Sequence, residues 1–162
     1  MDEPVPQWSS LDRFAFGDNP ELADALLELV LAGKKRATCW AASEGEKTHI
    51  GKLWVVLDGA GRPAAAIETT GLELRRFGEV DAAFAFAEGE GDRTLAHWRE
   101  AHRRYFTRRG EFAPDVLLWC ERFRLVARLP GRFDRRSRGR IGGAGGEPRA
   151  ARTESDKNGE RA

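Results

Sequence analysis

The segment KLWVVLDGAGRPAAAIETTGLEL (residues 52–74) indicates the fold class more directly than any other part of the chain. It contains two apolar runs, at 52–57 and 62–74, and the turn-forming residues Asp58-Gly59-Ala60-Gly61 lie between them. Two apolar runs joined by such a turn are typical of a β-hairpin. The segment therefore predicts two adjacent antiparallel strands near the middle of the chain.

Helical patterns lie on both sides of this hairpin. Asn19-Pro20 predicts a helix start, because the Asn side chain can cap the first turn and Pro fits the first helical position. Apolar residues then recur at helical spacing until Gly33. Further elements are expected as follows: helices at 7–14, 82–87 and 93–109, the last capped by Asp92, a strand entered at Thr38, and a long strand at 116–129.

This order of elements does not alternate strand and helix, which disfavours a doubly wound parallel sheet. We therefore predict an α+β fold, with a small mixed or antiparallel β-barrel or curled sheet flanked by helices.

The composition divides the 162-residue chain into two parts. Residues 1–129 carry a formal net charge of −3, whereas residues 130–162 carry +4 and contain seven of the 18 glycines. A segment with so few large apolar residues cannot bury enough surface to offset the entropy lost on ordering. We predict one domain at 1–129, including the N-terminal helical segment, and an Arg/Gly-rich disordered tail at 130–162.

Several classes of protein are disfavoured by the sequence. No run approaches the ~20 apolar residues of a membrane-spanning helix, and the acidic N-terminus is unlike a secretory signal. Cys39 and Cys120 have no neighbouring cysteine that would complete a zinc-binding pair. We therefore expect a cytoplasmic protein without membrane contact, metal centre or resident cofactor.

The candidate site begins immediately after the first helix. Lys34, Lys35 and Arg36 follow its end, where the helix dipole favours positive charge. Thr38 comes three residues after Lys35. Glu68 lies inside the second strand of the hairpin, where a carboxylate needs either solvent or a partner, and small alanines beside it leave room for a ligand. We group Lys35, Thr38 and Glu68 as candidate catalytic residues; the alternative is that they are a helix-end lysine, an ordinary strand residue and a surface carboxylate.

The chemistry of this group depends on the charge of Lys35. The Thr38 hydroxyl is a poor nucleophile until a base removes its proton, and Lys35 can be that base only if burial or its cationic neighbours lower its pKa. Glu68 could act as a general acid toward a leaving amine, or as an ion-pair partner that raises the pKa of Lys35. These roles conflict, and the sequence leaves both open.

Other side chains are candidates for binding a substrate. Lys34 and Arg36 could hold phosphate, and Trp40 is either a base-stacking residue or part of the core. His102 is either a general acid–base or a histidine on the apolar face of its helix. The same helix carries arginines that form either a basic face or a solvated surface: Arg103, Arg104, Arg108 and Arg109.

Four segments, taken in order, resemble a known family. They are LAGKKRATC (31–39), GKLW (51–54), AIETT (66–70) and CERF (120–123). Together they resemble the ASCH domain family over about residues 14–127. EGEGD (88–92), followed by Trp98, is similar to the longer bacterial branch of that family. Arg36 departs from the family pattern, which often has Thr at this position.

The resemblance implies a PUA-like β-barrel, a fold associated with RNA. It also implies two activities known in bacterial relatives: an amidohydrolase on acetylated cytidine, whose Lys, Thr and Glu match Lys35, Thr38 and Glu68, and a ribonuclease on single-stranded RNA. We therefore predict an RNA-associated protein that binds RNA or a nucleotide in this pocket. Ribonuclease, nucleoside amidohydrolase and non-catalytic RNA-binding module all stay open.

The predicted partners are RNA or a modified nucleoside. Substrate contacts are assigned to Lys34, Arg36, Trp40 and His102, and the basic stretch at 131–140 is expected to contact nucleic acid. A divalent metal stays open only for RNA cleavage.

Overall fold

The computed structural model describes residues 8–129. The predicted disorder of 130–162 and the nucleic-acid contact at 131–140 lie outside these residues. Within the described part of the chain, no helix is long and apolar enough to cross a membrane.

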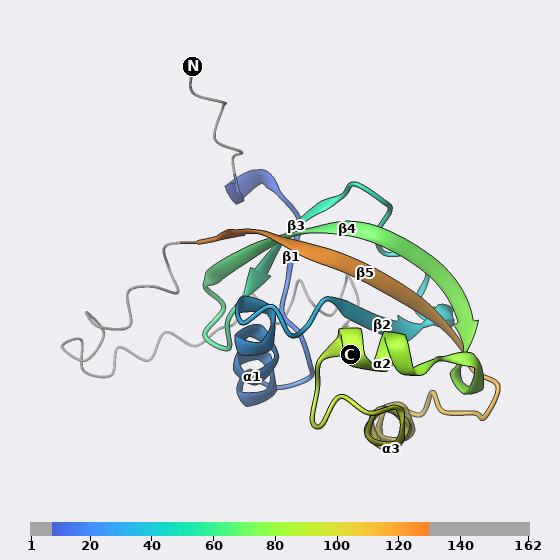
Figure 1. The fold of residues 1–162 in the computed structure, drawn as a ribbon. Helices are drawn as coiled ribbons and strands as arrows, with labels where there is room; N and C mark the ends of the chain where they lie inside the picture. The colour runs from blue at the N-terminus through green and yellow to red at the C-terminus, as the bar shows by residue number, and fades with distance from the viewer. Residues whose placement is uncertain (1–7, 130–162) are drawn as a thin grey trace.

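Five strands form one mixed sheet in the order β1-β3-β4-β5-β2 (Figure 1). β1 runs parallel to β3, and every other neighbouring pair is antiparallel. The predicted hairpin is present as β3 and β4, and its turn is closed by a hydrogen bond from the Asp58 amide to the Arg62 carbonyl (2.8 Å). The strands are β1 (Arg13–Phe14), β2 (Ala37–Ala41), β3 (Leu53–Leu57), β4 (Pro63–Arg76) and β5 (Leu117–Arg128).

The two longest strands, β4 and β5, pair along their whole length and form a ribbon. β3 pairs with the first half of β4, up to Glu68, and β2 pairs with the first half of β5, up to Arg122. Because the ribbon is antiparallel, β3 and β2 are added at its opposite ends. Register shifts at Ala66/Ile67 and Thr69/Gly71 interrupt the ribbon, and such irregularities bend a strand.

The sequence predicted a β-barrel or a curled sheet, and this topology corrects the barrel while it confirms the curled sheet. The edge strands of the five-stranded sheet are β1 and β2, and among the described residues they do not pair with one another. β1 has only two residues, and it lies at the end of the ribbon away from β2. The sheet is therefore curled but open.

Three α-helices lie on the side toward which the ribbon curves (Figure 1). They are α1 (Pro20–Leu31), α2 (Ala82–Glu88) and α3 (Leu95–Arg108). Asn19 caps α1 as predicted, accepting a hydrogen bond from the Leu22 amide at 2.8 Å. α3 is capped by Thr94 rather than Asp92, because Asp92 instead accepts hydrogen bonds from the Thr94 amide and hydroxyl.

The helix predicted at 7–14 is not present. A short 3₁₀ turn covers Trp8–Ser10, and Arg13–Phe14 then forms β1. Residues 13–14 form a strand because parallel pairing with β3 satisfies their backbone hydrogen-bonding groups, whereas a single isolated helical turn would leave such groups without partners. Two other 3₁₀ turns lie at Ala42–Glu44 and Phe77–Glu79.

Two main hydrophobic clusters lie along the ribbon. The first is built from α1, β3 and the early part of β4, with Phe14, Phe16 and Phe123. The second is built from β2, α2, α3 and the start of β5, with Trp98 and Phe106 among its buried aromatics. The segment between α1 and β2, residues 32–36, passes from one cluster to the other. Lys35 lies in this segment.

Candidate active site

The end of α2 lies directly against the segment that follows α1. The Arg36 amide donates to the Ala87 carbonyl at 2.6 Å. Gly89 ends α2 in the left-handed conformation (φ 75°). A Cβ atom at Gly89 would lie 2.3 Å from the Lys34 carbonyl oxygen, so only glycine permits this approach. The contact brings Glu88 and Glu90 to Lys35.

Lys35 is buried, and its ammonium group lies between two carboxylates. Nζ is 3.0 Å from Oε2 of Glu90 and 3.3 Å from Oε1 of Glu88. Burial by itself would lower the pKa of Lys35, but attraction to Glu90 and Glu88 outweighs it and raises the pKa above the ordinary value. Lys35 is therefore a cation at neutral pH, which answers the question that the sequence left open.

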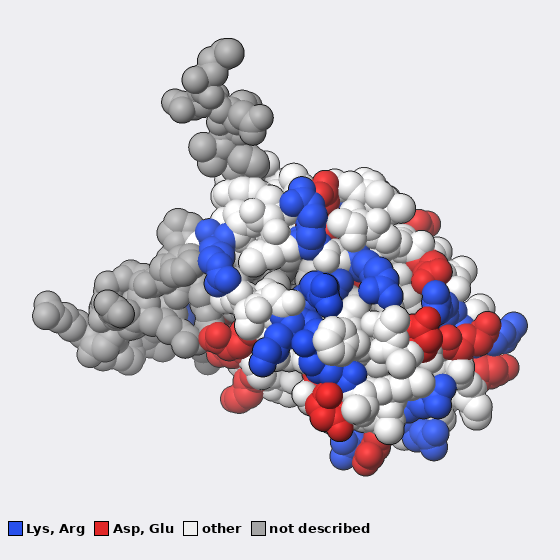
Figure 2. Space-filling view, in the orientation of Figure 1, with Lys and Arg blue, Asp and Glu red and all other residues white. Residues whose placement is uncertain are grey.

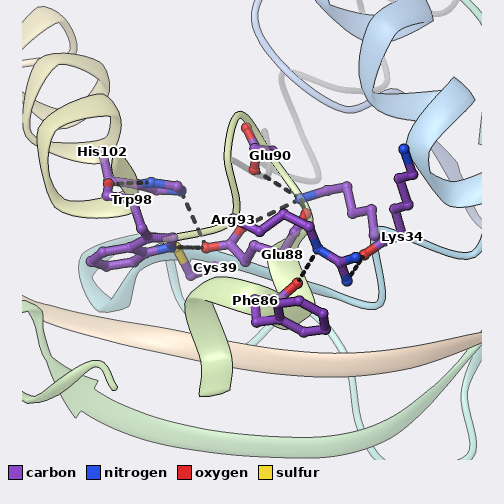
Figure 3. A network of polar contacts seen from close by, with 9 residues as sticks. Lys34, Cys39, Phe86, Glu88, Glu90, Arg93, Trp98 and His102 are labelled. Atoms are coloured by element: carbon purple, nitrogen blue, oxygen red, sulfur yellow. Dashed lines mark hydrogen bonds and ion pairs between the residues drawn. The ribbon is translucent and has the colours of Figure 1, made fainter. Parts of the chain in front are cut away.

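Glu88 is the centre of the buried polar network shown in Figure 3. Besides Lys35, its carboxylate accepts hydrogen bonds from the Trp98 indole and the Cys39 thiol (3.6 Å), and it lies 3.2 Å from Nε2 of His102. Burial favours the neutral acid, but the positive charges of His102 and Lys35 and the hydrogen bonds from His102 and Trp98 lower the pKa of Glu88 to about 2. Glu88 is therefore ionised.

The surroundings of His102 favour its doubly protonated form. Its ring stacks on Trp98 with centroids 4.3 Å apart, and Nδ1 lies 2.9 Å from the Trp98 carbonyl oxygen. Nε2 faces Glu88, so both ring nitrogens face groups that only accept hydrogen bonds. Burial would lower the pKa of His102, but Glu88 outweighs it and raises the pKa. The site thus contains two cations, Lys35 and His102, and two carboxylates, Glu88 and Glu90.

The side chains of the Glu88 network are already paired with one another, which argues against a metal ion bound among them. Atoms of Cys39, Glu88 and His102 lie within 4.8 Å of one another, a spacing that could suit an ion. However, Glu88 already accepts several hydrogen bonds, and the Lys35 ammonium lies 3.3 Å away. Burial and the nearby Glu88 also raise the pKa of Cys39, which keeps it a thiol. The cluster is organised as a charge-balanced network.

A pocket of about 320 Å³ opens beside this network, between α1 and α3. Glu90 and His102 line it and connect it to Lys35 and Glu88. Its remaining walls combine apolar side chains with two arginines: Gly17, Leu22, Leu26, Ala101, Arg104, Tyr105 and Arg108. The volume lies at the lower end of the range for small-molecule sites.

The structure brings together some of the sequence candidates and separates others. Lys35 and His102 meet through Glu88. The expected placement of Glu68 beside Lys35 is corrected: Glu68 is part-exposed on β4 and pairs with Arg124 of β5 at 2.7 Å. Thr38 is fully buried in β2, and strand alternation places it on the opposite face from Cys39.

Trp40 is also fully buried, and its indole donates to the Gly45 carbonyl at 2.8 Å. Its ring therefore offers no surface on which a base could stack in this structure.

Glu88 and Glu90 were not among the sequence candidates. The available signal was helical spacing, because Glu88 lies four residues after Phe84 and so falls on the buried face of α2.

An exposed aromatic side chain, Phe86, lies near the C-terminal end of α2, two residues before Glu88. Phe86 is 49% exposed, and the Arg93 guanidinium lies 3.5 Å from its ring centroid. Arg93 has a positive φ of 65°, and its guanidinium also donates to the Phe86 and Lys34 carbonyls (Figure 3). We call Lys34, Arg36, Phe86 and Arg93 the Phe86 surface.

Fold and site together define a class of protein: a small α+β domain of PUA-like fold, in which helices against a curled sheet hold a buried lysine between two carboxylates. Within that class, the chain belongs to the ASCH domain family, whose model matches residues 12–127.

Two solved structures support this assignment. An ASCH domain from Lactobacillus crispatus is 36% identical, with a TM-score of 0.67, and the match covers 74% of this chain and 81% of that one. A protein from Enterococcus faecalis is 34% identical, with a TM-score of 0.65 and coverage of 74% and 82%. A hypothetical protein at 15% identity, with a TM-score of 0.50 and coverage of 70% and 99%, shares the fold alone. No curated protein matches the chain.

Proposed function

We propose that this ASCH domain is a hydrolase of modified nucleosides, such as those found in RNA. It would bind one nucleoside unit in the pocket and hydrolyse an acyl amide on the base. The observation that carries the proposal is the Lys35–Glu90 ion pair, in which Glu90 lines the pocket and Lys35 is held as a cation behind it. A carboxylate beside a buried cation can move a proton and stabilise negative charge in one place.

The charge of Lys35 assigns the roles. An ammonium group cannot remove a proton from Thr38. Lys35 has no exposed side-chain surface, so in this proposal it acts from behind Glu90, where its charge stabilises the negative charge of a tetrahedral intermediate without contacting the substrate. Glu90 takes a proton from the attacking water as a C–O bond forms at the acyl carbon. When the C–N bond then breaks, Glu90 returns that proton to the leaving amino group of the base. The products are the free nucleoside and a carboxylic acid.

Thr38 has no catalytic role in this scheme, because it lies on the face of β2 opposite Cys39 and is not among the residues that line the pocket. It has no exposed surface, so it cannot reach a substrate without local opening. Thr38→Val separates the possibilities, since it removes the hydroxyl and conserves the shape. Loss of turnover comparable to that of Lys35→Met would support a nucleophilic Thr38, and retained turnover would support attack by water.

The proposal is tested by the hydrolysis of N4-acetylcytidine. We expect Glu90→Gln to lower kcat by roughly 10²-fold or more, because it removes the general acid–base. Glu68→Gln is the matched control: it changes the same chemical group at a position on β4 that pairs with Arg124 and does not line the pocket, so kcat should change by less than about twofold. No turnover by the wild-type protein, or equal loss in both variants, would contradict the proposal.

A second candidate function, binding and cleavage of single-stranded RNA, is favoured by the Phe86 surface. Figure 2 shows Lys and Arg side chains gathered in the middle of the face over α2 and β5. Lys34 and Arg36 are exposed and make no side-chain ion pair within residues 8–129. An exposed ring stacked with the Arg93 guanidinium, together with exposed cations on the segment that Arg93 contacts, suits base stacking combined with phosphate contacts.

This function is tested with a fluorescent single-stranded RNA. We expect Phe86→Ala to weaken binding by roughly 5- to 100-fold, as expected for the loss of one stacked base. Leu74→Ala, at a residue 48% exposed, is the control for removing an apolar side chain elsewhere. A gel time course with wild type and Lys35→Met then asks whether bound RNA is cut at the same site; cleavage by both proteins would place it elsewhere.

A further inference from the structure

The outer part of the pocket has a different chemical character from its buried end. Arg104, Tyr105 and Arg108 of α3 line it, and the two arginines are one helical turn apart on the same face. The buried end is formed by His102 and Glu90. Arg108 follows His102 by six residues, which is about 9 Å along the helix axis.

The charges along the pocket are unequal. At the buried end, Lys35 and His102 balance Glu88 and Glu90, as described above. At the outer end, Arg108 pairs with Asp18 at 2.8 Å, but Arg104 has no ion pair within the described part of the chain. The outer end therefore carries an excess positive charge, contributed by Arg104.

Apolar walls separate these two ends. Leu22 and Leu26 of α1 face the pocket from one side, and the Tyr105 ring faces it from the other. A flat, largely apolar group fits between them, with a polar reactive group at the Glu90 end and an anion at the arginine end. Planar guanidinium groups suit the oxygen atoms of phosphate particularly well.

We propose that the pocket binds a phosphorylated nucleoside, with its phosphate monoester held by Arg104 and assisted by Arg108. This inference rests on the proposed function, because it takes the base to lie at the Lys35–Glu90 end. It makes Arg104 a specificity-determining residue that discriminates a nucleotide from a nucleoside. The phosphate could belong to a free mononucleotide or to the end of an RNA chain.

Binding calorimetry with cytidine and cytidine 5′-monophosphate tests the inference without depending on turnover. We expect the monophosphate to bind at least tenfold more tightly than cytidine. Arg104→Gln should remove that advantage and leave cytidine affinity unchanged. Arg103→Gln is the matched control, because Arg103 neighbours Arg104 on α3 but is not part of the pocket lining and lies over Phe112 instead. It should leave both affinities unchanged.

The outcomes separate the two proposals. Equal binding of cytidine and its monophosphate would overturn the phosphate site while leaving the proposed function intact. Equal loss in the Arg103 and Arg104 variants would also overturn it, because it would indicate attraction by the overall charge. No binding of either compound would refute the nucleoside pocket and the phosphate site together. A 5′-phosphorylated trinucleotide compared with cytidine 5′-monophosphate identifies the source of the phosphate: an RNA end if the trinucleotide binds more tightly, and a free nucleotide if it binds more weakly. The unphosphorylated trinucleotide is the control, and it should bind more weakly than the phosphorylated one.

Discussion

Gly89 and Gly33 provide a controlled test of how the site is assembled. Both follow a helix and have similar positive φ angles, 75° and 77°. Alanine in this conformation costs roughly 1–2 kcal/mol at either position. At Gly33 a Cβ atom meets nothing within 4 Å, whereas at Gly89 it meets the Lys34 carbonyl oxygen at 2.3 Å and carbon at 2.6 Å.

The backbone at Gly89 and the backbone at Lys34 can move apart only if the end of α2 moves. Such a movement breaks the hydrogen bond from Arg36 to Ala87, worth about 1 kcal/mol, and it misaligns the buried ion pairs of Lys35, whose complete loss would cost roughly 3–5 kcal/mol. We therefore expect Gly89→Ala to be less stable than Gly33→Ala by about 2–4 kcal/mol.

Urea unfolding monitored by tryptophan fluorescence measures this difference directly. The two variants should unfold with similar urea dependence but different midpoints, because the exposed surface is the same. If Gly89→Ala is no less stable than Gly33→Ala, the close approach does not hold the carboxylates at Lys35, and the reasoning is wrong.

Four further predictions concern the buried network. Burial lowers the pKa of His102, but the effect of Glu88 is larger and raises it. The charged ring therefore contributes fully to the free energy of unfolding below about pH 6.5, and this contribution is lost as the pH rises through the raised pKa. In urea unfolding between about pH 6 and 9, His102→Gln should remove the resulting decline in stability. The pKa of Glu88 is about 2 against an ordinary 4.5, so its contribution is present above about pH 4.5 and is lost as the pH falls toward 2; Glu88→Gln should flatten this acid limb. Trp98→Phe removes a donor to Glu88 and should cost roughly 1–3 kcal/mol and shift acid unfolding to higher pH, and an unchanged acid midpoint would contradict its role. Burial raises the pKa of the Cys39 and Cys120 thiols, so iodoacetamide should label them only after unfolding, as read by mass spectrometry, and rapid labelling of the native protein would refute their inaccessibility.

The elements that the sequence predicted well are those with local signals. α1 has its cap, its Pro at the first position and its apolar periodicity within a dozen residues, and the β3–β4 hairpin has its turn between two apolar runs. The first turn at Trp8–Ser10 has no comparable signal, and the pairing of β1 with β3 involves partners about 40 residues apart.

The composition of the site depends on distant contacts, which local patterns do not reveal. Lys35 meets Glu88 and Glu90 across 53 and 55 positions of the chain. Glu68 is in a plausible strand position, but its partner is set by the register of β4 against β5, which places Arg124 opposite it. The sequence could identify Lys35 as a candidate because of the cations around it, but only the fold could decide its charge.

The β4–β5 ribbon gives the pocket two independently anchored walls. Leu22 and Leu26 belong to α1 and the hydrophobic cluster at one end of the ribbon, whereas Tyr105 belongs to α3 and the cluster at the other end. The register shift at Thr69/Gly71 lies between these ends, and an irregularity of this kind bends the strand. The width of the pocket therefore depends on how strongly the ribbon is bent, because its two walls are fixed near opposite ends of that ribbon.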